Sequence, residues 1–182
     1  MSVYSTPYKN QPSVLNLAVT AMVILVTAVY GIIALNTEDA LWFWPTFAET
    51  PRGIVIHCYG QDIAVPSGTA QFTGLTALVN EGLSGRKNWD GLSMSDETYL
   101  AYQTSPQMLS LEMTYAPPVR VHSTYKYFSS VDTMVIPLDG RHAQTNPVFG
   151  RVRGLMTAGS LHLETMAPLL EYVQEQGLCR KS

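Results

Sequence analysis

Residues Val14–Leu35 read VLNLAVTAMVILVTAVYGIIAL, a run of 22 residues that no Asp, Glu, Lys, Arg or His interrupts. A helix of this length, at about 1.5 Å per residue, reaches roughly 33 Å and so crosses a hydrocarbon core of about 30 Å. Its polar members fit a membrane helix, because a threonine hydroxyl can bond a backbone carbonyl and because Asn16 and Tyr30 lie towards the two ends. The run therefore predicts a transmembrane helix over residues 14–35.

A cleavable signal peptide is the main alternative for this run. The apolar region of a signal peptide usually has about 7–15 residues and ends at a small-residue site of the A-x-A type. Here the run is longer, and its end, Ile32–Asn36, lacks that pattern. A buried helix of a soluble domain is a second alternative, but helices that are apolar on every side are rare in small domains. We favour an uncleaved membrane helix.

The charges that flank the helix predict its orientation. The N-terminal segment, residues 1–13, carries Lys9 and no acid, whereas the linker, residues 36–51, carries Glu38, Asp39 and Glu49 and no base. Because basic segments stay in the cytoplasm, we expect a cytoplasmic N-terminus and an extracytoplasmic domain in the cell membrane.

Aromatic residues flank the helix on both sides. Rings with an apolar body and a polar edge suit the headgroup layer of a bilayer. The candidate membrane-interface residues are Tyr4 and Tyr8 before the helix and Trp42, Phe43, Trp44 and Phe47 after it. The alternative for the sequence Trp42-Phe43-Trp44 is packing into the domain core or against a partner subunit.

The remaining residues, 52–182, suffice for one modest domain. Met108–Tyr115 alternates apolar and polar residues, which predicts a strand with one wet face, and Ser93-Met94-Ser95-Asp96 has the form of a capping box. We expect strands at 54–59, 62–65, 108–115, 119–122, 133–138 and 148–153, helices at 69–82, 96–103 and 165–176, and a polar loop at 84–92. This order predicts an α+β fold with a mainly antiparallel sheet and two or three helices.

Charge excludes one class of function. The chain has 14 acidic and 11 basic side chains, a net charge of −3, and only 14% of its residues are charged, against about 25% in soluble domains. Residues 36–182 hold 10 bases and 14 acids without a long run of either sign. This pattern excludes a nucleic-acid binder that works through bulk positive charge. A surface so sparse in charge favours contact with a protein partner or with the bilayer.

Motifs of catalysis and cofactor binding are missing from the sequence. There is no C-x-x-C-H, paired C-x-x-C, G-x-S-x-G, Walker A or G-x-G-x-x-G pattern. Four histidines are scattered singly, and Ser160 near His162 is by itself no catalytic triad. We therefore predict no catalytic residue, no metal site and no cofactor.

Two weaker site signals remain. Asp139, Arg141 and His142 lie together after an apolar strand, where ligand-binding loops are often found, although Asp139-Gly140 is equally a turn signal. Cys58 and Cys179 both fall outside the membrane, in a compartment that is oxidising in many bacteria. They can form a disulfide between the first strand and the end of the chain, or remain two free thiols.

These features favour a non-catalytic, single-pass membrane protein, an accessory or structural subunit whose domain docks on a larger membrane complex. Its partners would be the lipid bilayer and other membrane-protein subunits, without nucleic acid. Accessory subunits of respiratory or photosynthetic electron-transfer complexes have this plan, which is an analogy at the level of architecture. The alternatives are an extracytoplasmic sensing or ligand-binding module and a membrane-anchored enzyme of unrecognised type.

Overall fold

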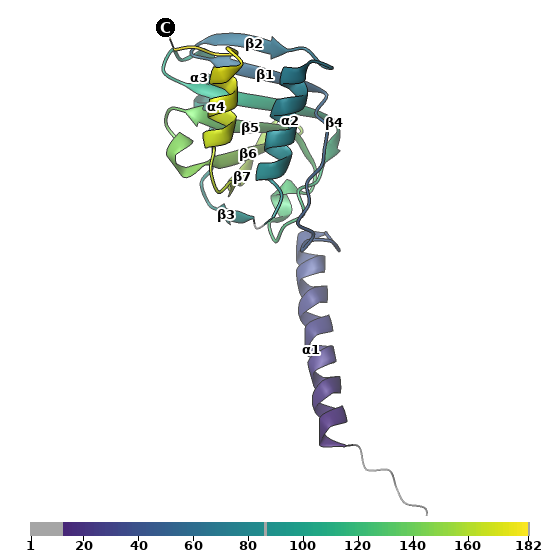
Figure 1. The fold of residues 1–182 in the computed structure, drawn as a ribbon. Helices are drawn as coiled ribbons and strands as arrows, with labels where there is room; N and C mark the ends of the chain where they lie inside the picture. The colour runs from purple at the N-terminus through teal and green to yellow at the C-terminus, as the bar shows by residue number, and fades with distance from the viewer. Residues whose placement is uncertain (1–12, 86, 182) are drawn as a thin grey trace, which may run out of the picture.

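An exposed apolar helix carries a separate folded domain at its C-terminal end (Figure 1). The computed structural model describes residues 13–85 and 87–181, so the candidate interface residues Tyr4 and Tyr8 lie outside the described residues. Helix α1 (Val14–Thr37) has 24 residues, and its most apolar stretch has a mean hydropathy of 2.4 with no residue buried. It is long and apolar enough to cross a membrane, and its place near the N-terminus also fits a signal sequence.

Every strand of the described chain joins one antiparallel sheet of seven strands, in the order β2-β1-β4-β5-β6-β7-β3. The strands are β1 (Gly53–Cys58), β2 (Gln61–Val65), β3 (Asn88–Asp90), β4 (Leu109–Val119), β5 (Val131–Asp139), β6 (Pro147–Val152) and β7 (Leu155–His162). The helices of the domain are α2 (Ala70–Gly82), α3 (Asp96–Thr104) and α4 (Ala167–Glu175), with short 3₁₀ turns η1 (Lys126–Phe128) and η2 (Ala143–Thr145). The predicted α+β class is confirmed.

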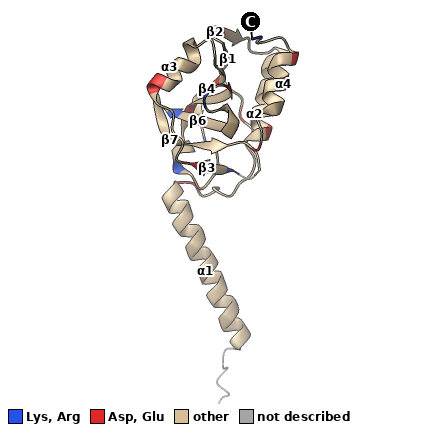
Figure 2. Cartoon of the chain, turned by 90° about the vertical axis from the view of Figure 1, so that its left-hand side faces the viewer, with Lys and Arg blue, Asp and Glu red and all other residues tan. Residues whose placement is uncertain are grey.

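Helices cover both faces of the sheet. Figure 2 shows α2 and α4 on one face and α3 on the other. The alternation in β4 sends Leu111 and Met113 into the main core, where Leu75 of α2 and Val173 of α4 are fully buried. The opposite face has a smaller apolar cluster, formed by Met94, Tyr102, Val135 and Phe149. The larger core therefore lies between the sheet and the pair α2 and α4.

Three strands differ from the sequence prediction. The expected strand at 119–122 is wrong, because β4 continues through Pro117 and Pro118, with a shifted register, and ends at Val119. Proline has no N–H to donate to a neighbouring strand. Both prolines are exposed, so no buried hydrogen bond between strands is lost there. Residues 155–162 form β7, which was not predicted. Part of the expected polar loop forms β3, which pairs with β7.

The strands of the sheet are stacked along the direction that leads away from α1 (Figure 1). In Figure 1 the strands follow one another away from α1, with β3 closest to the helix and β2 farthest from it. The end of the domain next to α1 is therefore formed by β3, η1 and the linker that follows α1, and we call it the base of the domain.

Candidate functional site

A buried carboxylate fastens the end of α1 to the domain. Asp39 is only 7% exposed, and one of its oxygens accepts a hydrogen bond of 2.8 Å from Nδ1 of His122. Arg120 donates to the carbonyl oxygen of Glu38 at 2.8 Å, and its guanidinium lies 4.0 Å from the Asp39 carboxylate. We call Glu38, Asp39, Arg120 and His122 the joint. Its four residues come from two segments more than 80 positions apart, so it connects the end of α1 to the segment that follows β4.

Contacts with α1 and contacts within the turn itself also stabilise the turn after α1. Glu38 adopts the left-handed conformation that ends the helix, with φ of 54°. The second oxygen of Asp39 accepts from the Leu41 N–H at 2.9 Å, and the Tyr30 hydroxyl donates to the Ala40 carbonyl at 2.8 Å. The ring of Tyr30 also meets Phe43 edge-on, with 6.3 Å between centroids. The direction of α1 is therefore fixed relative to the domain.

Phe47 differs from its expected role at the membrane interface. Its side chain is 4% exposed and packs edge-on against Tyr115 in the main core. Its backbone N–H also donates a hydrogen bond to the Ser84 hydroxyl, at 3.0 Å. Phe47 lies in the core because the linker runs beside α2, where the backbone of Glu49 exchanges hydrogen bonds with the side chain of Asn80. By contrast Phe43 and Trp44 are about half exposed.

The base of the domain contains a cavity of about 270 Å³. Its lining combines aromatic residues of the linker with polar residues from the segments after α2 and β4. The lining residues are Trp42, Phe43, Trp44, Gly85, Lys87, His122, Ser123 and Thr124. The Lys87 ammonium donates to the carbonyl oxygens of Pro45 at 3.0 Å and Gly85 at 3.3 Å. Burial lowers the pKa of Lys87.

All three tryptophans of the chain lie at the base. Trp42 and Trp44 belong to the linker, and Trp89 is in β3, the edge strand nearest α1 (Figure 1). The exposed Trp89 ring stacks on Tyr125 at 4.7 Å between centroids, and Tyr125 in turn contacts Tyr127. The sequence identified the linker aromatics but not Trp89, because that residue lay in a segment expected to be a loop.

A polar network under α3 is the most chemically capable cluster in the described chain, and the sequence analysis missed it. The buried His57 of β1 contacts Asp62 at 2.6 Å through Nδ1 and Glu112 at 3.2 Å through Nε2. Tyr99 of α3 donates to the same Glu112 carboxylate at 2.8 Å, and the Arg151 guanidinium lies 4.3 Å from the Tyr99 ring centre. The only available signal was the alternation that puts Glu112 on the polar face of its strand.

The electrostatics of this network favour charged His57 and Glu112. Burial alone would lower the pKa of His57, but hydrogen bonds and charges from Glu112 and Asp62 outweigh it and raise that pKa. Burial would raise the pKa of Glu112, but the hydrogen bonds from His57 and Tyr99 hold it below its usual range. Burial and the Glu112 charge raise the pKa of Tyr99 to about 12. The network ties α3 to β1 and β4, and none of its residues lines the cavity at the base.

The structure also brings Ser160, His162 and Asp90 together where β3 pairs with β7. A Ser-His-Asp triad needs the serine and the carboxylate on opposite ring nitrogens. Here both meet Nε2 of His162, at 3.4 Å and 3.0 Å, while Nδ1 lies 2.6 Å from the Thr145 carbonyl oxygen. Ser160 is fully buried. The geometry suits the attachment of β3 to the sheet rather than a nucleophile.

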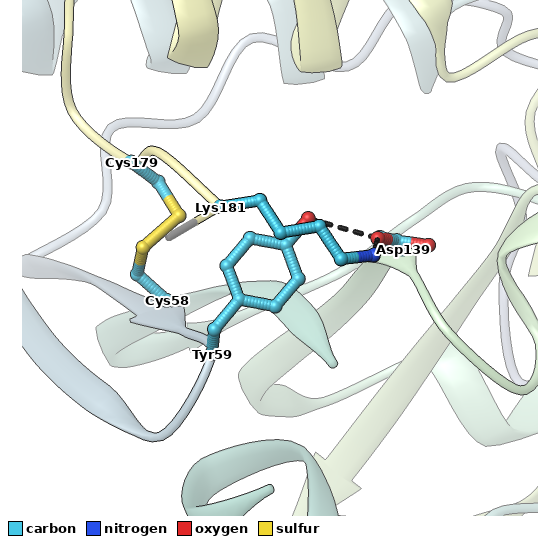
Figure 3. The surroundings of a disulfide bond; sticks show 5 residues. All are labelled: Cys58, Tyr59, Asp139, Cys179 and Lys181. Atoms are coloured by element: carbon cyan, nitrogen blue, oxygen red, sulfur yellow. Dashed lines mark hydrogen bonds and ion pairs between the residues drawn. A yellow bond between two sulfur atoms is a disulfide. The ribbon is translucent and has the colours of Figure 1, made fainter. Parts of the chain in front are cut away.

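The ligand-loop candidates do not converge. Asp139 accepts from the Tyr59 hydroxyl at 2.8 Å and lies 3.0 Å from the Lys181 ammonium (Figure 3). His142 instead packs near Tyr102 and Phe149 of the smaller cluster, and burial lowers its pKa. Arg141 is exposed. The three residues therefore face different surroundings.

Cys58 and Cys179 form a disulfide that joins the end of β1 to the tail after α4 (Figure 3). Both residues are buried, at 7% and 4% exposure. Lys181 lies over the Tyr59 ring, 5.0 Å from its centre, beside this bridge. The disulfide fits a domain outside the cytoplasm.

Comparisons with known proteins do not extend these observations. No protein-family model matches the sequence, no curated protein is similar to it, and no solved structure matches the fold.

Proposed function

We propose that the chain is a non-catalytic single-pass membrane protein, an accessory subunit whose domain docks in a fixed orientation on a larger membrane complex. The joint is the observation that carries this proposal. A flexible linker leaves the orientation of the domain that it carries undefined. Here Asp39, His122 and Arg120 instead hold the domain at a set angle to α1. Fixed placement is of use where the domain must meet a partner at a defined position.

The chemistry of the domain agrees with a role other than catalysis. The His57–Glu112 network connects α3 to the sheet, and the Ser160–His162–Asp90 cluster connects β3 to β7. In both clusters the histidine is hydrogen-bonded within the fold, whereas Nε of Arg151 beside Tyr99 is buried without a partner among the described residues. The accessory subunits of respiratory and photosynthetic electron-transfer complexes are the setting that we favour, on the analogy of architecture alone.

The proposed topology has a cytoplasmic N-terminus and an extracytoplasmic domain. The acids of the linker and the absence of bases from it support this direction. The disulfide between Cys58 and Cys179 supports it as well, since such bonds persist in oxidising compartments.

Native electrophoresis of mildly solubilised membranes tests the proposal. We expect the protein in a band far above its own 20.1 kDa, together with other membrane subunits that mass spectrometry identifies. The variant Asp39→Ala should weaken this co-migration while it leaves the membrane helix intact. Glu175→Gln, which changes an exposed carboxylate on α4, serves as the control. Migration of the wild-type protein alone would refute the proposal.

A further inference from the structure

The cavity at the base lies at the level of the bilayer headgroups if α1 spans the membrane. The apolar run of α1 ends at Leu35. Trp42, the first residue along the chain that lines the cavity, follows seven positions later. The turn between them stays against the end of the helix, because Asp39 bonds to Leu41 and His122. Figure 1 shows this turn beside the end of α1. Whatever fills the cavity therefore comes from the interface region.

The polar residues in the lining of the cavity are suited to an anion, and Lys87 is the cation among them. The Lys87 ammonium has three N–H donors, and two of them donate to the carbonyl oxygens of Pro45 and Gly85. Within the described residues, no carboxylate lies within 4.0 Å of this ammonium, and no Asp or Glu lines the cavity. A half-buried cation without an ionic partner gains from an added anion, because attraction between charges is stronger at a partly dry site.

Thr124 supplies a further donor, whereas His122 uses its Nδ1–H in the contact with Asp39. The hydroxyl of Thr124 makes no hydrogen bond within residues 13–85 and 87–181, and its side chain is exposed at the cavity. A lysine ammonium and a hydroxyl in the lining of one cavity match the oxygens of a phosphate group.

The aromatic residues in the lining and the size of the cavity favour a lipid over a free ion. Trp42, Phe43 and Trp44 offer apolar and aromatic surface that a bare phosphate ion would not contact. The volume of about 270 Å³ is just below the usual range of pockets that enclose a drug-sized ligand, about 300–1,000 Å³. It fits a headgroup whose acyl chains remain in the bilayer.

We infer that this cavity binds the phosphate group of a phospholipid headgroup from the leaflet next to the domain. The inference rests on α1 remaining in the membrane, which is part of the proposed function, and needs no partner complex. Lys87 and Thr124 contact the phosphate oxygens, and the linker aromatics contact the glycerol region. A bound headgroup also holds the base against the bilayer, in addition to the joint.

Retention of lipid by the purified full chain tests this inference. The protein in detergent is mixed with phosphatidylglycerol, and native mass spectrometry measures how much lipid remains bound after the micelle is removed. Diacylglycerol, which lacks the phosphate, and inorganic phosphate, which lacks the apolar part, are the two comparison probes. We expect retention of phosphatidylglycerol alone. Equal retention of diacylglycerol, or equally tight binding of inorganic phosphate, would overturn the inference.

Two matched pairs of variants separate the cavity from general effects. Thr124→Glu puts a negative charge at the cavity, and Thr124→Gln puts a neutral side chain of the same length there. Lys87→Gln removes the cation, and Lys126→Gln removes a lysine of η1 that lies outside the cavity. Thr124→Glu and Lys87→Gln should each lower retention about tenfold, the usual effect of losing a charged hydrogen bond. The two controls should stay within about twofold of wild type.

The outcome for each pair is decisive. An equal loss in Lys87→Gln and Lys126→Gln would mean general charge attraction, and an equal loss in both Thr124 variants would mean a disturbed shape. Either result overturns the phosphate site. Thr124 is exposed, so its variants keep the fold even if Lys87→Gln does not. A failure of lipid retention leaves co-migration on native gels unaffected, so the two proposals fail separately.

Discussion

Replacing Cys58 and Cys179 together by alanine should lower the free energy of unfolding of the domain by up to about 5 kcal/mol. The disulfide closes a loop across a sequence separation of 121 residues. In the chain-entropy model a loop of this size removes about 16 cal/mol/K from the unfolded ensemble, or about 5 kcal/mol at 25 °C. Measured losses of native disulfides usually fall between about 2 and 5 kcal/mol, so we expect a result in that range.

Besides the disulfide, Leu178 packs against the core and Lys181 contacts Asp139 and the Tyr59 ring. The ion pair between Lys181 and Asp139 is well exposed, at 62% and 39% for the two side chains, and such pairs contribute less than about 1 kcal/mol. The variant Lys181→Gln is therefore the control, with an expected change within about 0.5 kcal/mol.

Urea unfolding of the full chain in detergent, followed by tryptophan fluorescence, measures both variants. Reduction of the wild-type protein by dithiothreitol should reproduce the effect of the double substitution. A double variant within about 1 kcal/mol of the wild type would refute the entropic reasoning, and so would a control that lost as much as the double variant.

Three further predictions concern the joint, the network under α3 and the base. Asp39→Ala should cost about 1–3 kcal/mol in urea unfolding, because it leaves His122 and Arg120 without their buried carboxylate; an unchanged midpoint would contradict the role of the joint. Because the folded pKa of His57 is raised, its stabilising effect is complete below about pH 6.5 and is lost as the pH rises through the folded pKa. The stability difference between wild type and His57→Gln should therefore shrink between pH 5 and pH 9, whereas a constant difference would show that His57 stays neutral. Gly159→Ala should cost about 1–3 kcal/mol, since a Cβ there would lie 2.5 Å from the Asp90 carbonyl oxygen and 2.6 Å from the Tyr125 hydroxyl. Gly91→Ala, with open space around its Cβ, should change unfolding by less than about 0.5 kcal/mol, and equal effects of the two would argue against the close packing at β3.

Local patterns predicted the parts of the fold that local forces determine. The spacing of Phe72, Leu75 and Val79 identified α2, and all three side chains are buried. The helix expected at 96–103 is confirmed as α3, but its N-cap is Ser95, whose hydroxyl accepts from the Thr98 N–H at 3.1 Å, rather than Ser93 of the expected capping box. In both cases the relevant contacts lie within a few residues of one another, where a sequence pattern records them directly.

The strands that were missed depend on distant contacts. Asn88–Asp90 is too short and polar to be identified as a strand, and it becomes one because Trp89 stacks on Tyr125 and Asp90 meets His162. The polar network has the same origin, because His57 and Glu112 meet only after β1 pairs with β4. The joint likewise unites Asp39 and His122, 83 positions apart. A single sequence carries no signal for such pairings.

The order of the strands also determines how far the far edge of the sheet, β2, lies from the edge next to α1, β3. Six steps of about 4.8 Å separate the first strand from the seventh, so the β2 edge stands roughly 29 Å above the β3 edge. With α1 across the bilayer and β3 at its surface, the disulfide and the basic pair Arg180 and Lys181 are at the far end of the domain (Figure 1). Of the described elements, a partner that stays close to the headgroups reaches β3, η1, β7 and the linker (Figure 1). A partner that contacts the tail must itself project by a similar distance from the membrane.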